Sequence, residues 1–110
     1  MISVRVGVSR GRLRSLYSSG HAIDPGEGSP ACAAVSVLVA GTSRTLSGRG
    51  GCHVDGRAPE PGSLELKVLR VRPGRGRWLR GVTDLLLQGL RDVADEYPEA
   101  LQLTIEEKGE

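Results

Sequence analysis

The stretch "LRGVTDLLLQGLRDVADEYPEALQLTI", Leu79 to Ile105, contains the signals of a helix followed by those of a strand. Apolar side chains recur at helical spacing, and the pattern stops at a proline: Leu79, Val82, Leu86, Leu90, Val93, Tyr97, then Pro98. Leu101, Leu103 and Ile105 then alternate with polar residues, which predicts a strand. A long amphipathic helix beside a half-buried strand predicts a domain in which helices cover a sheet.

The segments before this helix alternate in the same way. Leu64, Leu66 and Val68 predict a strand with a bulge or an end of pairing near Val68, where the apolar phase shifts. Cys52 to Val54 predicts a short edge strand. At the N-terminus, alternation from Ile2 to Val8 predicts a strand, and the turn "SRGR" leads to a weaker strand over residues 13–19.

Another helix is predicted after the Gly- and Pro-containing loop of residues 22–29. In "SPAC", Ser29 is suited to the N-cap and Pro30 to the first helical position. Val35, Leu38 and Thr42 continue one helical face, and we expect this helix to end before Gly48. The expected fold is α+β, a mixed β-sheet with two helices in the order β-β-α-β-β-α-β, in a single domain over residues 1–110.

Composition limits the partners and the location. The chain has 110 residues, no Phe and a net charge of +2, so charge alone does not indicate nucleic acid or membrane. A core of aliphatic residues in a short chain favours a homodimer, because small domains hide a smaller fraction of their surface. The N-terminus lacks a signal-peptide pattern and the apolar run Ala31 to Gly41 is too short to span a bilayer, so we expect a cytoplasmic protein with free thiols.

His21 and Cys32 lie on either side of the 22–29 loop. A cysteine in a first helical turn is in a position that favours the thiolate, because unpaired N–H groups point toward it. His21 could then act as its base. The alternative is that Cys32 is a small buried apolar residue and His21 a structural one.

The cysteines, histidines and basic residues allow two other kinds of site. A zinc site would need His21, Cys32, Cys52 and His53, but no C-x-x-C motif is present, so we expect no metal and no other cofactor. The run Lys67 to Arg80 is rich in Lys and Arg and has no acidic residue, so it could contact RNA. A solvated basic face explains the same run, since Trp78 is its only aromatic residue.

The motifs "SGHA" (Ser19 to Ala22) and "CAAVSVL" (Cys32 to Leu38) resemble the ribosomal-processing cysteine protease family, Prp. The resemblance extends to the element order and to Gly89, Leu90, Tyr97 and Pro98. It implies a cytoplasmic, dimeric cysteine endopeptidase that removes the N-terminal extension of a bacterial large-subunit ribosomal protein, the one numbered twenty-seven.

The same resemblance assigns the catalytic roles, with Cys32 as nucleophile and His21 as general base. Gly20 and Ser36 also match the family pattern, and Ser36 lies one helical turn after Cys32. The family commonly has Asp where this chain has Ser29, which keeps the helix cap but removes a charge. The competing hypothesis is a non-catalytic ribosome-associated module that binds RNA or protein through the Lys67 to Arg80 face.

Overall fold

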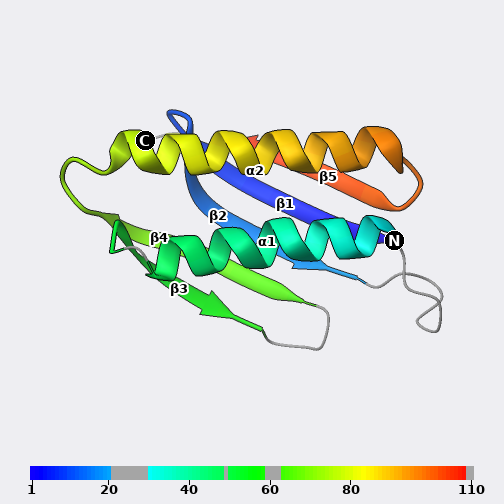
Figure 1. Ribbon diagram of the computed structural model, residues 1–110, viewed down its shortest axis with the longest axis horizontal. Coiled ribbons are helices and arrows are strands. Elements are labelled where there is room, and N and C mark those ends of the chain that lie inside the picture. Colours follow the sequence, from blue (N-terminus) through cyan, green and yellow to red (C-terminus); the bar gives the residue numbers. More distant parts are fainter. Residues whose placement is uncertain (21–29, 49, 59–62, 109–110) are drawn as a thin grey trace.

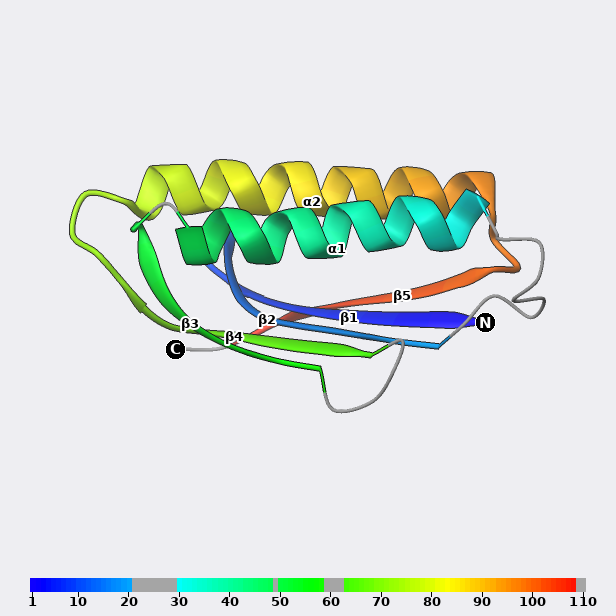
Figure 2. The same cartoon turned by 60° about the horizontal axis from the view of Figure 1, so that its bottom comes forward.

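Two helices cover one face of a five-stranded sheet (Figures 1 and 2). The computed structural model describes residues 1–20, 30–48, 50–58 and 63–108. The elements are β1 (Ile2–Ser9), β2 (Arg12–Ser19), α1 (Pro30–Gly48), β3 (Cys52–Arg57), β4 (Leu64–Val71), α2 (Gly76–Glu96) and β5 (Leu101–Glu107). The predicted α+β class and element order are confirmed, and α1 includes Gly48, one residue more than predicted.

The sheet has the strand order β3-β4-β2-β1-β5. β1 and β5 are parallel, and the other neighbours are antiparallel, so the sheet is mixed as predicted. β3 lies at an edge, as predicted for Cys52 to Val54. Val68 pairs with Val54 and Arg70 with His53, so Leu69 is the extra residue of a bulge next to Val68.

The core lies between the sheet and the helices and is built from aliphatic side chains. β1 contributes Ile2, Val4 and Val6, and the completely buried Leu79 and Leu90 of α2 pack on the same cluster. α1 and α2 run in opposite directions side by side (Figure 2). Neither helix in the described part of the chain is long and apolar enough to cross a membrane.

Thr83 of α2 connects that helix to the sheet through a buried hydroxyl. Its Oγ1 donates to the Leu79 carbonyl (2.7 Å) and accepts from the Leu13 N–H (2.9 Å). Leu13 lies where the β1–β2 register shifts, so its amide is satisfied by this side chain.

We expect Thr83→Val to lower the free energy of unfolding by about 1–3 kcal/mol, because the buried Leu13 N–H loses its acceptor. Thr83→Ser keeps the hydroxyl and is the matched control. Urea unfolding of both variants measures the difference. A loss in Thr83→Ser with none in Thr83→Val would mean that packing of the methyl group, and not the hydrogen bond, is what matters.

Candidate active site

Cys32 lies in the first turn of α1, as predicted. Pro30 is the first helical residue, and Ala31 is buried against the sheet while Cys32 is half-buried. The first turn contains no acidic side chain. The thiol therefore lies beside the unpaired N–H groups of the helix N-terminus.

Ser36 is exposed one turn further along α1, on the same side of the helix as Cys32. Its hydroxyl is thus available to a molecule that reaches the thiol. The predicted base His21 and the predicted N-cap Ser29 lie outside the described residues, so their roles stay predictions. The structure describes Cys32, Ser36 and Gly20 of the predicted site.

Gly20 follows Ser19, the last residue of β2, and directly precedes His21. Its φ is +106°, and a Cβ at this position would overlap the backbone carbonyl oxygen of Met1. The start of β1 and the end of β2 lie at the same end of the molecule as the first turn of α1 (Figures 1 and 2). Because of this φ and this contact, only glycine fits at the position directly before His21.

We expect Gly20→Ala to destabilise the protein by about 1–3 kcal/mol, because alanine at this φ is strained and meets the Met1 backbone. Peptidase activity should fall further than stability explains, since a shift here moves His21. Thermal unfolding and cleavage rates measured on the same preparation separate the two effects. Wild-type stability and activity in Gly20→Ala would contradict the steric role.

Cys52 has a different environment, at the other end of α1. It is 8% exposed, and its Sγ contacts the Leu46 carbonyl oxygen at 3.9 Å. Burial raises the pKa of the Cys52 thiol, and the nearby Arg75 charge only partly opposes this. Leu46, which Cys52 contacts, lies about 21 Å along the helix from Cys32, at about 1.5 Å per residue. The two thiols therefore cannot share one site. His53, next to Cys52, is exposed.

The different environments of the thiols predict selective alkylation. With iodoacetamide at neutral pH, we expect Cys32 to react at least about tenfold faster than Cys52, because the raised pKa of Cys52 lowers its thiolate fraction and burial limits access. Peptide mass spectrometry after timed quenching measures both rates. Faster modification of Cys52 would contradict the assignment of Cys32 as the reactive thiol.

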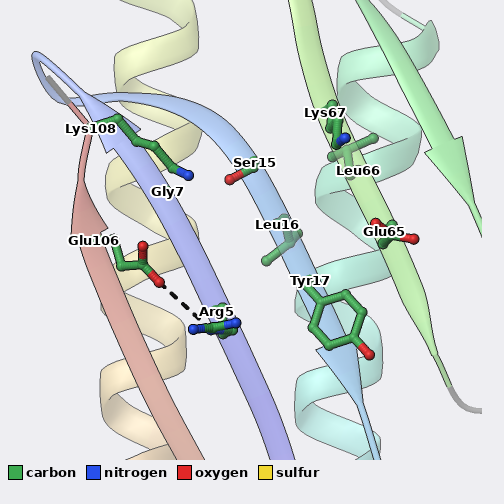
Figure 3. A pocket seen from close by; sticks show the side chains of 10 residues that line it. All are labelled: Arg5, Gly7, Ser15, Leu16, Tyr17, Glu65, Leu66, Lys67, Glu106 and Lys108. Atoms are coloured by element: carbon green, nitrogen blue, oxygen red, sulfur yellow. Dashed lines mark ion pairs between the residues drawn. The ribbon is translucent and has the colours of Figure 1, made fainter. Parts of the chain in front are cut away.

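The open face of the sheet has a hollow of about 490 Å³, but its chemistry is different (Figure 3). Charged and polar side chains of four strands line it, among them Arg5, Tyr17, Glu65 and Lys67. Arg5 of β1 pairs with Glu106 of the neighbouring strand β5 at 3.6 Å. Among the described residues that line it there is neither a cysteine nor a histidine. We therefore place the candidate active site at the start of α1, in the helical layer on the other side of the sheet.

Comparison with known families gives the affiliation of the chain. The family described as cysteine protease Prp matches residues 1–102. The chain belongs to this cysteine protease family. Members are hydrolases, so the predicted family and enzyme class are confirmed, and the non-catalytic alternative loses its support.

Several solved structures share the fold. The ribosomal processing protease Prp from S. aureus with a covalently linked product peptide has a TM-score of 0.79 at 18% identity, over 96% of this chain and 100% of that chain. The same protease with a substrate peptide gives 0.74 at 19% identity, with the same shares. SMU.848 from Streptococcus mutans gives 0.75 at 20% identity, over 98% of this chain and 96% of that chain. No curated protein sequence matches the chain.

Proposed function

We propose that this Prp-family protease removes the N-terminal extension of the bacterial large-subunit ribosomal protein numbered twenty-seven. The observation that carries the proposal is the position of Cys32 in the first turn of α1. The S. aureus relative is an essential ribosomal processing protease, which supports the same class of substrate here. Cys52 does not compete for the role, because it is buried and its pKa is raised.

The proposed reaction uses Cys32 as nucleophile and His21 as general base. His21 accepts the thiol proton, and the Cys32 Sγ attacks the carbonyl carbon of the scissile peptide bond. The C–N bond breaks, and the leaving amine takes the proton from His21. Water then hydrolyses the thioester, which releases the second product and restores the thiol. The reaction needs no metal or other cofactor.

Three neighbours of the pair have supporting roles in the proposal. Ser29 caps α1 and so keeps the first-turn N–H groups aligned around the thiol. The exposed Ser36 hydroxyl hydrogen-bonds the bound peptide beside Cys32. Gly20 fixes the backbone from which His21 follows. Because Ser29 carries no charge, its role in this proposal is limited to capping the helix.

The test is cleavage of the ribosomal protein from the same organism, followed by intact-mass measurement. We expect a single cut within the N-terminal extension, and none in a substrate that already lacks the extension. Prior alkylation of the enzyme should abolish the cut. Cleavage at many unrelated sites, or none with the natural substrate, would contradict the proposed specificity.

The proposal also includes a cytoplasmic homodimer. α1 carries a single charged residue, Arg44, and the outer faces of the helices expose Val37 (71%) and Leu85 (72%). Pairing of two helical layers would remove these side chains from water. Sedimentation velocity tests this association, and a concentration-independent monomer would contradict it.

A further inference from the structure

Arginines from three separate segments gather at the end of the molecule opposite the first turn of α1. The β1–β2 turn with the start of β2, the end of β4 with its loop, and the start of α2 meet there (Figure 1). We call this surface the arginine end and define it as Arg10, Arg12, Arg14, Arg70, Arg72, Arg75, Arg77 and Arg80. The sequence run Lys67 to Arg80 is thus only part of a larger surface.

Contacts between the segments hold this surface together. Arg10 and Gly11 both have positive φ, which forms the tight β1–β2 turn. Arg80 donates from Nη2 to the Arg10 carbonyl oxygen at 3.0 Å, which joins α2 to the turn. The Arg12 guanidinium packs against Gly76 at the start of α2. These contacts hold the backbone that carries the arginines in place. Arg10, Arg12 and Arg14 also line a hollow of about 140 Å³.

The loop between β4 and α2 is fixed in the same way. The Arg72 N–H donates to the Gly51 carbonyl at 3.0 Å, and the Arg75 N–H donates to the Arg72 carbonyl at 3.1 Å. These backbone bonds leave the Arg72 guanidinium exposed, as Arg70 and Arg77 also are. The side chains are available to a ligand without any rearrangement of the fold.

Positive charge strongly outweighs negative charge at the arginine end. No acidic residue occurs from Lys67 to Arg80, and the first turn of α2 contains none. Glu107 of β5 approaches this end, where it accepts the backbone N–H of Arg10 at 3.2 Å. On the open sheet face, by contrast, charges form pairs such as Arg57 with Asp55 at 3.5 Å. The net charge of +2 therefore conceals a concentrated positive surface.

The arrangement of Trp78 indicates which kind of anion fits. Its ring packs against buried Gly51, and the Arg75 guanidinium lies 4.5 Å from the ring centroid on top of it. The Arg75 guanidinium thus covers a face of the ring that could otherwise stack on a nucleic-acid base. Rigid guanidinium groups spread over several segments suit the repeated phosphates of a folded nucleic acid, which each can accept two hydrogen bonds.

We propose that the arginine end binds the phosphate backbone of folded RNA, while the Cys32 end remains open to peptide. The two ends are separated by about 25 Å, the length of α1 beyond Cys32. Binding should depend on shape and charge rather than on base sequence. The choice of RNA over DNA rests on the proposed function, because a ribosomal protein assembles on RNA.

The test measures anisotropy of a fluorescent RNA hairpin with the full chain over a range of salt concentrations. The variant Arg70→Gln, Arg72→Gln, Arg77→Gln should bind at least about tenfold more weakly and reduce the slope of log K against log salt by about 2. The matched control, Arg5→Gln, Arg57→Gln, Arg91→Gln, loses the same charge elsewhere and should bind within about twofold of wild type. Equal losses in both triple variants would overturn the proposed surface.

Competing ligands test the choice of partner. We expect a DNA duplex of equal length, polyglutamate and anionic lipid vesicles each to bind more weakly than the hairpin. Equal or tighter binding of any of them would overturn the choice of RNA. Peptide cleavage without RNA should be the same in both triple variants as in wild type. Thus RNA binding can fail while cleavage persists, and Cys32→Ala should abolish cleavage while RNA binding persists.

Discussion

Replacing Cys32 with alanine is expected to lower peptide cleavage by about a thousandfold or more, because the reaction loses its nucleophile. The free energy of unfolding should change little, since Cys32 is only half-buried at the helix start and alanine suits a helix. Cleavage rates of the extension peptide and urea unfolding of the same preparation provide the two measurements.

Cys52→Ala is the matched control for this experiment. It removes the other thiol, which is buried at the far end of α1. This variant should lose some stability through the cavity it creates but retain the cleavage rate of its folded fraction. Normal cleavage by Cys32→Ala, or loss of cleavage specific to Cys52→Ala, would contradict the assigned nucleophile.

Replacing His21 with alanine is expected to reduce the cleavage rate by about 10²–10⁴, the usual contribution of a general base. The loss should be greatest near neutral pH and shrink as rising pH ionises the thiol without help. His53→Ala removes the other histidine, which is exposed on β3, and should leave the rate unchanged. A full pH profile of kcat/KM for the three proteins gives the comparison. A wild-type profile in His21→Ala would exclude the base role.

Local patterns predict the elements well because each strand and helix buries one face. The alternation in β1 and β5 and the helical spacing in α2 correspond to buried Val4, Leu101 and Leu86. The shift of apolar phase after Val68 corresponds to the bulge at Leu69. In these places the position of a side chain along its own segment decides whether it faces the core.

Features that depend on distant segments cannot be predicted from these patterns. The parallel pairing of β1 with β5 joins the two ends of the chain, and no local signal specifies it. The sequence run Lys67 to Arg80 indicates only part of the arginine end, because Arg10 and Arg12 lie far from it in sequence. Gly20 matches the family motif, but its steric role depends on the Met1 backbone, which only the fold brings beside it.

The most direct test of the central claim is to trap the covalent intermediate. The enzyme is mixed with the extension peptide, quenched in acid during turnover, digested at low pH and mapped by mass spectrometry. We expect a thioester between the N-terminal product and Cys32, absent from Cys32→Ala. An acyl group on Cys52 or on a serine, or turnover without an adduct on Cys32 in any quench, would contradict the assignment of Cys32 as nucleophile.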